Sequence, residues 1–369
     1  MEITTLQENL KKGLSIVQNI IGKNLTLPIL NNILLAVEKK RLKLVATDLE
    51  IAIVHFTSCK VDKEEEITIP AKLFSDLINN IPNKKVEIKT KDNTLQIKCE
   101  NFKSIIKGID SKEFPIIPKI KGEFIAKIES LKLKQALSQV VNFTSASDIR
   151  PEISGVLIKF ESNEIKFVAT DSFRLGEKTI SFKGDKNKIK KSVIVPLKTI
   201  QELIRILAEG EKEDIVEIFI EQNQILFKMP NTEMISRLIE GNYPNYEQLI
   251  SKQFETSLFV EKNEFINMVK ITSLFTSRIN DLRLKIIPKK SLVEAFAQNV
   301  DVGENTAQLS GEIKGKEMEI IFNCKYLLDG LNNIYSDKVM IGLNSESSPA
   351  IIKPAGDPTY VYVLMPIKL

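Results

Sequence analysis

The sequence predicts an α+β protein built from three similar domains, each with two helices packed on antiparallel sheets. Two observations predict this class. The chain has 369 residues, of which 43% are hydrophobic and 27% charged, so its composition is that of a globular protein long enough for several domains. Several short landmarks also recur at a spacing of about one third of the chain, which is typical of an internal repeat.

The clearest landmark is a strand-like segment that ends in Ala-Thr-Asp. It occurs as LKLVATDLEIAI around Asp48 and returns as IKFVATDSFRLG around Asp171, 123 residues later. The third copy keeps no such segment and has QNVDVGENTAQLSG in that region. We therefore expect domains at 1–122, 123–250 and 251–369. Further landmarks support the same period: Lys72 after Pro70, Lys198 after Pro196, Lys325 after Asn323, and the pair Phe114-Pro115 with Tyr243-Pro244.

Each repeat opens with an amphipathic helix. In the first copy Leu6, Leu10, Leu14, Val17 and Ile21 recur at helical spacing. Short alternating strands follow, then a second helix after the Pro or Asn landmark, then two or three closing strands. Strands and helices do not alternate strictly, which favours antiparallel sheets over a doubly wound fold. The expected helices span 6–21, 72–80, 131–142, 198–207, 262–275 and 325–335.

Composition excludes several classes of protein. The longest apolar run, Tyr360–Met365, is far shorter than the roughly 20 residues that cross a bilayer, and the polar start has no signal-peptide core, so we expect a cytoplasmic protein. The three cysteines lie far apart without a CxxC pair, which predicts neither a zinc site nor a disulfide framework. The single histidine, His55, sits among apolar residues and is interpreted as a packed structural residue. We expect no metal and no cofactor.

The charge balance permits a polyanion as partner. The net charge is +4, and 45 of the 52 basic residues are lysine, which suits sequence-independent phosphate contacts better than base reading. None of the six expected helices carries a net negative charge, although ordinary solvated helix faces explain this equally well. A domain of this size is about 35 Å across, so three in contact leave a hole of about 5 Å and six leave one of about 35 Å. Since B-DNA is about 20 Å across, two chains could encircle a duplex and one could not.

Two alternatives remain open at this point. The first is an enzyme, with Asp48 and Asp171 as catalytic carboxylates; we interpret both instead as residues that end a strand and shape a turn. The segment GEIKGKE at 311–317 faintly resembles a phosphate loop, but its spacing is one residue short and no Ser or Thr follows Lys316. The second alternative is a peptide-binding scaffold without a role on DNA.

The chain resembles the bacterial DNA polymerase III beta subunit, the sliding clamp and processivity factor of DNA replication. The threefold repeat, LTLPILNNILL near the start, ATDSFRL in copy two, YPNY at 243–246 and the ending YVLMPIKL carry the resemblance over essentially the whole chain. It implies a non-catalytic protein. It also implies a head-to-tail homodimer that forms a closed ring of six domains around duplex DNA, with helices lining the hole and sheets forming the outer wall.

The resemblance also implies partners. They are the replicative polymerase's catalytic subunit, the clamp loader, repair and translesion polymerases, and other proteins with clamp-binding peptides. Such clients insert a short peptide into an apolar groove between the second and third domains. The matching positions in this sequence are Ile153, Thr170, Ser172, Phe173, Arg174, Leu175, Pro244, Gln248, Leu249, Ser345, Ser348, Val363, Met365 and Pro366.

Three positions depart from the family pattern. Ser172 and Phe173 stand where Gly-His is common, and the loss of glycine is expected to alter a turn that tolerates positive φ. Phe173 is expected to narrow the mouth of the groove, and Gln248 replaces a common arginine. For DNA, the resemblance points to Lys23, Asn24, Ser147 and Arg150, with Lys72 and Lys198 as further candidates from the repeat. For the dimer seam we chose apolar residues, Ile78 and Ile106 against Ile271 and Leu274.

Overall fold

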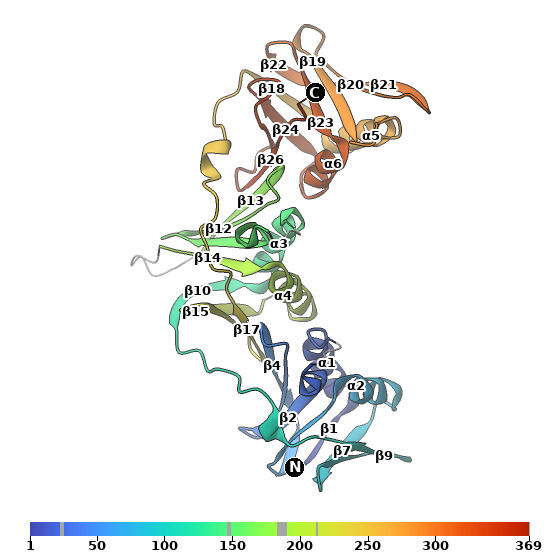
Figure 1. The fold of residues 1–369 in the computed structure, drawn as a ribbon, viewed down its shortest axis with the longest axis vertical. Coiled ribbons are helices and arrows are strands. Elements are labelled where there is room, and N and C mark those ends of the chain that lie inside the picture. Colours follow the sequence, from blue (N-terminus) through green and yellow to red (C-terminus); the bar gives the residue numbers. More distant parts are fainter. Residues whose placement is uncertain (23–25, 146–148, 183–189, 212, 369) are drawn as a thin grey trace. The chain divides into compact units, whose positions relative to one another are not determined.

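The computed structural model describes residues 1–22, 26–145, 149–182, 190–211 and 213–368 (Figure 1). The chain forms two compact units, which are treated separately below. Unit 1 contains Met1–Lys134 and Lys198–Leu238, and unit 2 contains Gln135–Leu197 and Ile239–Leu369. No helix among the described residues has both the length and the apolar character that a membrane crossing needs. The thiols of Cys59, Cys99 and Cys324 are free.

The helices match the expected ones within three residues at each end. They are α1 (Gln7–Gln18), α2 (Ala71–Asn80), α3 (Ser130–Val140), α4 (Leu197–Glu209), α5 (Lys262–Ser273) and α6 (Cys324–Asn332). Short 3-10 helices lie at η1 (Pro28–Asn31), η2 (Ser111–Glu113), η3 (Val141–Phe143), η4 (Pro151–Ile153), η5 (Glu247–Leu249) and η6 (Pro288–Lys290).

Unit 1 holds two antiparallel sheets. The five-stranded sheet has the order β5-β1-β7-β8-β9, and the eight-stranded sheet has the order β10-β15-β16-β17-β4-β3-β2-β6. Their bounds are β1 (Glu2–Leu6), β2 (Asn32–Glu38), β3 (Arg41–Thr47), β4 (Ile51–Ser58), β5 (Lys60–Lys63), β6 (Glu66–Pro70), β7 (Lys85–Lys91), β8 (Thr94–Cys99), β9 (Phe102–Lys107), β10 (Glu123–Glu129), β15 (Ile215–Glu221), β16 (Gln224–Lys228) and β17 (Thr232–Arg237).

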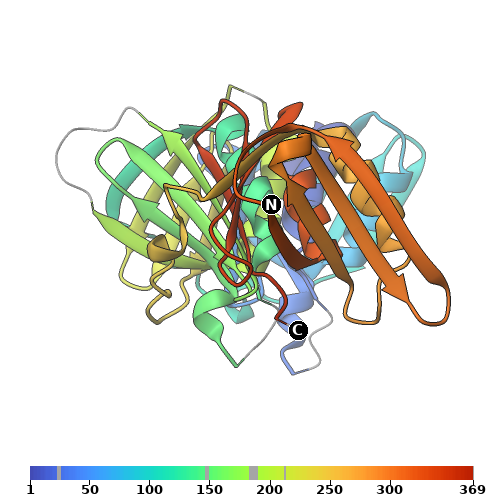
Figure 2. The ribbon, with the colours of Figure 1, turned by 90° about the horizontal axis from the view of Figure 1, so that it is seen from above.

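Unit 2 repeats this plan with nine and four strands. The larger sheet has the order β14-β11-β12-β13-β26-β25-β24-β18-β22, and the smaller has β21-β20-β19-β23, whose long strands lie side by side in orange in Figure 2. Their bounds are β11 (Gly155–Phe160), β12 (Glu164–Thr170), β13 (Arg174–Ser181), β14 (Lys191–Pro196), β18 (Thr256–Glu261), β19 (Asp281–Ile287), β20 (Leu292–Asn299), β21 (Gly303–Ser310), β22 (Glu312–Gly315), β23 (Met318–Asn323), β24 (Lys338–Leu343), β25 (Ala350–Pro354) and β26 (Tyr360–Leu364).

Helix α1 packs on strands β3 and β4 through most of the face that the sequence predicted, but Leu6, the first residue of that face, lies in β1 and is 41% exposed. Leu10, Leu14 and Val17 are buried, because their spacing of three and four residues places them on one side of the helix. Gly13 lies at the closest approach, where a Cβ atom would come within 2.6 Å of Leu44 and 2.7 Å of Thr57. The helix can therefore approach the sheet this closely only with glycine at that position.

The repeat is visible in how the strands pair. In unit 1, β4 pairs with β17 and Ala52 lies opposite Ile235. In unit 2, β13 pairs with β26 and Leu175 lies opposite Val363. In both cases the strand after an Ala-Thr-Asp turn is joined to the third of three closing strands. We call these two pairings the first and the second junction.

The two Ala-Thr-Asp turns have the same local geometry. Asp48 accepts hydrogen bonds from the backbone N–H groups of Glu50 and Ile51 through Oδ1, and Asp171 does the same for Phe173 and Arg174. The interpretation of both aspartates as turn residues is confirmed. The segment at 311–317 forms strand β22 and its approach to β23, with no helix after Lys316, so it lacks the form of a phosphate loop.

Candidate functional site

The second junction forms the floor of the candidate site. Leu175 and Val363 belong to a buried apolar cluster with Leu157, Ile351 and Tyr246 on one face of the nine-stranded sheet. The opposite face packs on Phe143, as shown by Gly176, where a Cβ atom would come within 2.4 Å of the Phe143 ring. Side chains alternate along a strand, so the cluster around Leu175 lies on the face of the nine-stranded sheet opposite the face that packs on Phe143.

The walls of this surface come from three other segments. Tyr243 packs against the cluster, and its hydroxyl donates to the Val168 carbonyl at 3.4 Å. Burial raises the pKa of the Tyr243 hydroxyl, which stays protonated and able to donate. The Met365 N–H donates to the Phe173 carbonyl at 2.9 Å, so the C-terminal segment lies beside the turn at Ser172.

The predicted client residues differ in exposure. Ile153, Leu175 and Val363 are buried, and Thr170 is nearly so, with its hydroxyl donating to the Arg174 carbonyl. Phe173 is 60% exposed and Leu249 is 38% exposed. The remaining residues are half-buried or exposed: Ser172, Arg174, Pro244, Gln248, Ser345, Ser348, Met365 and Pro366. The pairing of β13 with β26 brings Arg174, Leu175, Val363 and Met365 together, and the Ser345 and Ser348 hydroxyls lie 2.6 Å apart in the loop before β25.

The turn at Ser172 keeps the geometry that glycine would permit. Ser172 has φ of 79°, and Leu49 at the matching position of the first repeat has φ of 76°. The Ser172 N–H donates to the Thr170 hydroxyl at 3.1 Å, and its own hydroxyl accepts from Arg150 at 3.0 Å. Serine therefore adopts positive φ at this position, where local hydrogen bonds hold it, and whether the turn differs from one with glycine stays a prediction.

Arg174 is the electrostatic centre of this surface. Its guanidinium donates to Asp171 at 2.9 Å and to Asp329 of α6, and it lies over the rings of Tyr326 at 4.3 Å and Phe143 at 5.4 Å. Burial opposes its charge, but the two carboxylates outweigh burial and hold the pKa of the guanidinium above its usual value. Arg174 therefore fixes the turn, the sheet and α6 to one another.

Sequence reasoning missed the α6 residues of this cluster. Phe173 stacks on Tyr326 with ring centroids 6.3 Å apart and planes at 28°. Tyr326 follows the repeated Lys325 directly, and Asp329 lies three residues further on the same helix face. The spacing was a usable signal, because the repeat had already placed Lys325 at the start of a helix.

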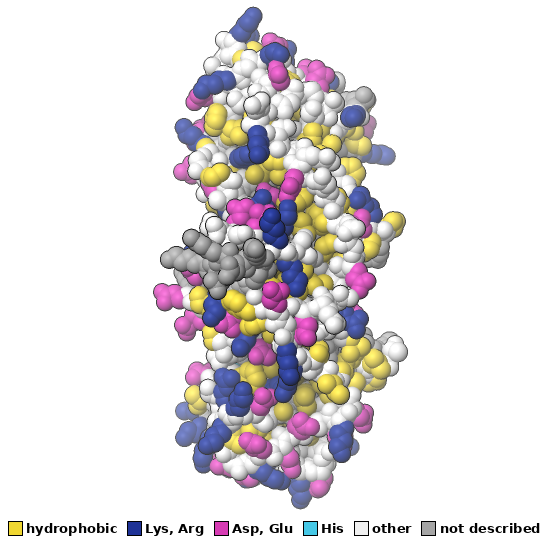
Figure 3. Space-filling view, turned by 90° about the vertical axis from the view of Figure 1, so that its left-hand side faces the viewer, with side chains coloured by type: hydrophobic (Ala, Val, Ile, Leu, Met, Phe, Trp, Pro, Cys, Tyr) yellow, Lys and Arg dark blue, Asp and Glu magenta, His cyan; other side chains and the backbone are white. Residues whose placement is uncertain are grey.

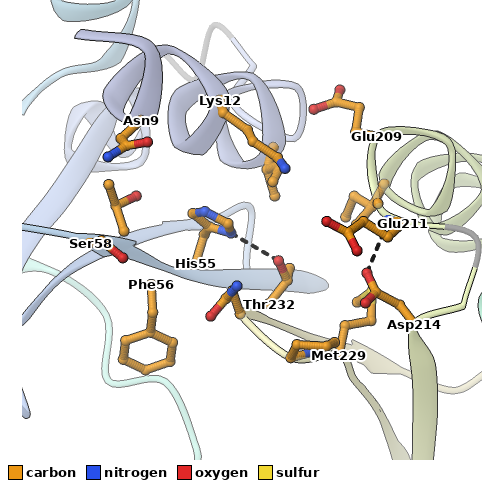
Figure 4. Close-up of a pocket in the computed structure, with 16 residues that line it drawn as sticks. Asn9, Lys12, His55, Phe56, Ser58, Glu209, Glu211, Asp214, Met229 and Thr232 are labelled. Atoms are coloured by element: carbon orange, nitrogen blue, oxygen red, sulfur yellow. Dashed lines mark hydrogen bonds between the residues drawn. The ribbon is translucent and has the colours of Figure 1, made fainter. Parts of the chain in front are cut away.

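His55 lies at the first junction and has a structural environment. Its Nδ1 is 2.9 Å from the Thr232 hydroxyl, in a cavity of about 310 Å³ that Lys12, Glu209, Glu211 and Asp214 also line (Figure 4). Burial, assisted by the charges of Lys12 and Arg41, lowers the pKa of His55 to about 4, so the ring is neutral at pH 7. Within the described residues no group of three or more His, Cys, Asp or Glu could hold a metal ion.

Comparisons with known proteins identify the fold family. Models of the DNA polymerase III beta subunit match in three parts: the N-terminal domain at residues 1–118, the central domain at 127–245 and the C-terminal domain at 247–368. The chain belongs to the DNA polymerase III beta subunit family. The beta sliding clamp of Synechococcus elongatus is 28% identical to it over 100% of both chains. The beta sliding clamp of Staphylococcus aureus is also 28% identical, over 99% of this chain and 97% of that one.

Solved structures of this family have the same fold. The DNA polymerase sliding clamp of Bacillus subtilis matches with a TM-score of 0.94 and 26% identity, over 100% of this chain and 99% of that one. The DNA polymerase III beta subunit of Pseudomonas aeruginosa matches with a TM-score of 0.95 and 27% identity over the whole of both chains. The beta subunit fold therefore extends over the full sequence.

The DNA candidates of this beta subunit family member are only partly described. Lys23, Asn24 and Ser147 lie outside the described residues. Arg150 is exposed and pairs with Glu152 at 3.2 Å, and Lys72 is exposed at the start of α2. Lys198 is exposed at the start of α4 but forms an ion pair with Asp48. The negative charge of Asp48 weakens the attraction of Lys198 for a phosphate. On the face in Figure 3, basic, acidic and hydrophobic side chains are interspersed.

Two of the four seam candidates are not at the surface. Ile78 and Ile106 are 0% and 4% exposed, so each packs in the core of its own repeat and has no area to offer a second subunit. The exposed large apolar residues on the same elements are Leu73 of α2 and both Phe102 and Ile105 of β9. Ile271 and Leu274, at the end of α5, are exposed as expected.

Proposed function

We propose that two copies of this chain close head to tail into a ring that encircles duplex DNA and tethers the replicative DNA polymerase to it. The chain belongs to a family of non-catalytic processivity subunits, and its relatives are named as sliding clamps. A tether around the duplex keeps the polymerase near its primer and so raises its effective concentration there. We propose that it acts in the cytoplasm and that its domains meet near residues 122 and 250.

The observation that carries the ring is the exposure of two residues whose repeat counterparts are buried. Ile235 and Val363 occupy equivalent places on β17 and β26 and are 6% and 1% exposed, because β4 and β13 cover them. Their counterpart on β9 is Ile105, which is 69% exposed because β9 is an edge strand. An uncovered edge of this kind can pair with a strand of another chain.

The helices give the same result independently. Counting from the first residue of each helix, Ile16 of α1, Gln139 of α3 and Ile271 of α5 are equivalent. Ile16 accepts a hydrogen bond from Arg205 and Gln139 donates one to the Asn333 carbonyl; both are buried, at 4% and 3%. Their counterpart Ile271 is instead 53% exposed. The end of α5 is therefore the second surface that is uncovered in the single chain, after Ile105 of β9.

These two uncovered surfaces define the seam. Strand β21 is the counterpart of β4 and β13 and is likewise an edge strand. This supports the proposal that β9 of one copy pairs with β21 of the next. The contact is heterologous and closes after two copies if the family's six-domain ring applies. Low-resolution imaging of the purified protein tests this proposal: a ring with a central opening supports it, and a compact or linear particle contradicts it.

We further propose that the surface at the second junction is the client site. Its residues are Ile153, Thr170, Ser172, Phe173, Arg174, Leu175, Pro244, Gln248, Leu249, Ser345, Ser348, Val363, Met365 and Pro366. An apolar floor with a few oriented hydroxyl and carbonyl groups is what an extended peptide requires, and Met365 can repack around different side chains. The proposed clients are the polymerase catalytic subunit, the clamp loader, and repair and translesion polymerases.

On DNA we propose weak, water-spaced phosphate contacts from Lys72, Arg150 and Lys198, together with Lys23, Asn24 and Ser147. A ring that must slide along DNA is helped by contacts to phosphates, because such contacts do not recognise the base sequence. These contacts should weaken with salt, whereas a closed ring should remain on DNA without free ends.

A further inference from the structure

A cavity of about 540 Å³ lies in unit 1 at the first junction. Its floor is apolar and is formed by Val54, Leu226 and Ile235, with the half-buried Phe56 beside them. Figure 4 shows Phe56 pointing away from the side of β4 that faces α1, whereas His55 points toward α1. The cavity therefore opens on the sheet face opposite the helix. We call it the junction groove.

The rim of the junction groove is basic. Lys39, Arg41, Lys43, Lys119 and Lys228 line it, against only Glu38 and Glu233. Lys43 pairs with Glu38 at 2.9 Å, which leaves an excess of cations around the floor. Arg41 lies over the Phe56 ring at 4.6 Å and donates to Asn231 at 2.8 Å, so its charge is held beside the apolar surface.

One wall of the groove is a stretch of backbone that has no hydrogen-bond partner among the described residues. Residues 115–122 join β9 to β10 without regular secondary structure, and Ile117 and Ile120 of this linker line the groove. Residues 116–120 form no hydrogen bond with any residue that the structure describes, whereas Lys121 N–H donates to Glu221 at 2.8 Å. Backbone groups that are free in this way can pair with an extended segment of another chain, as an edge strand does, although Pro118 offers only its carbonyl.

The repeat gives the junction groove a counterpart. Ile235 is equivalent to Val363, and the linker after Phe114-Pro115 is equivalent to that after Tyr243-Pro244 at the second junction. The two surfaces differ in charge, because the basic rim of the first has no match among the client residues of the second apart from Arg174, which two carboxylates neutralise.

We propose that the junction groove binds an acidic, extended peptide segment of a protein partner, separately from the clients of the second junction. Apolar side chains at alternate positions of the peptide would contact Phe56, Leu226 and Ile235. Its carboxylates would face Lys39, Arg41 and Lys119, and its backbone would pair with residues 116–120. A nucleic acid would satisfy the cations but leave the apolar floor uncovered.

Binding of a defined probe to the full chain tests this proposal. The probe is a fluorescein-labelled decapeptide in which glutamates alternate with leucine and phenylalanine, and the reference carries glutamine in place of glutamate. By fluorescence anisotropy we expect saturable binding of the acidic probe and about tenfold weaker binding of the reference. Lys119→Glu should weaken the acidic probe about fivefold and Ile120→Ser about tenfold.

Matched controls separate the groove from general charge and from the client site. Lys121→Glu, on the same linker but outside the groove, should leave binding unchanged, and so should Met365→Ala at the second junction. Thermal unfolding of each variant checks that it is folded. The proposal is overturned if the acidic probe does not saturate, if Lys121→Glu weakens it as much as Lys119→Glu, if Met365→Ala abolishes it, or if a single-stranded decanucleotide binds more tightly.

Discussion

Replacement of Ile105 by glutamate should convert the dimer to monomers. Ile105 lies on the outer face of β9 and is 69% exposed in the single chain. Covering that exposed part at a seam is worth about 1.5 kcal/mol. A ring of two copies has two seams, so the lost burial alone costs the dimer about 3 kcal/mol, or roughly 100-fold in its dissociation constant. A carboxylate without a partner in the seam adds to this loss.

Sedimentation velocity over a concentration series measures that dissociation constant. Ile116→Glu is the matched control, because Ile116 is 94% exposed on the linker after β9 and outside the proposed seam. We expect the control to remain a dimer at concentrations where Ile105→Glu is monomeric, with both variants folded by circular dichroism. A dissociation constant of Ile105→Glu within threefold of the wild type would refute the pairing of β9 with β21.

Three further predictions concern the junctions. Met365→Ala should lower the affinity for a client peptide at least about tenfold in a calorimetric titration and leave the dimer intact. The matched control is Met318→Ala, at a half-buried methionine elsewhere, which should change neither the affinity nor the dimer. Equal peptide affinities of Met365→Ala and the wild type would remove Met365 from the site. Arg174→Met should lower the free energy of urea unfolding by about 2 kcal/mol, because the largely buried Asp171 carboxylate loses its ion pair, whereas the half-exposed Asp329 is hydrated. A double-mutant cycle with Asp171→Asn should give a coupling of about 1 kcal/mol or more, and additive losses would contradict the ion pair. His55 takes up a proton below pH 6.5 in the unfolded chain but only near pH 4 in the folded chain. Its contribution to the free energy of unfolding should therefore be complete above pH 6.5 and fall by about 3 kcal/mol toward pH 4. His55→Gln should remove this part of the dependence of the unfolding free energy on pH, and an unchanged dependence would show that other groups cause it.

The sequence predicted the architecture because the repeat is carried by residues with strong local roles. The Ala-Thr-Asp segments at Asp48 and Asp171 form equivalent turns, and the second helix of each repeat begins within one residue of Lys72, Lys198 and Lys325. Apolar spacing of three and four residues then located the core face of each helix.

Strand β21 (Gly303–Ser310) escaped prediction for a physical reason. Its sequence GENTAQLS contains few large apolar side chains, and its exposed edge needs few. A strand is recognised in a sequence when apolar residues on one face alternate with polar residues on the other. An edge strand such as β21, with few large apolar residues on either face, shows little of this alternation. The sequence of the third repeat therefore gave the apolar pair Ile271 and Leu274 as seam candidates but gave no sign of this edge strand.

On β9 the seam residue predicted from the sequence, Ile106, and the one proposed from the structure, Ile105, differ by one position. Ile105 and Ile106 are adjacent, so both fit an alternating pattern, and a shift of one residue exchanges the two faces of a strand. The structure resolves the ambiguity, since Ile106 lies opposite Leu95 in the core and Ile105 lies opposite Gln96. The partners of Arg174 were also missed, because Phe143 and Asp329 lie about 30 and 150 residues away in the sequence. The repeat placed Asp329 on a helix but did not indicate that this helix meets the turn at Asp171.

The central claim is that the ring holds DNA by enclosing it. The most direct measurement loads the protein, with its loader, onto nicked circular DNA, raises the salt concentration to about 0.5 M and compares retention before and after linearising the circle with a restriction enzyme. The account predicts that the protein stays on the closed circle and runs off the linear molecule. Loss from both at the same rate would mean that charge alone holds it, and the topological account would be wrong.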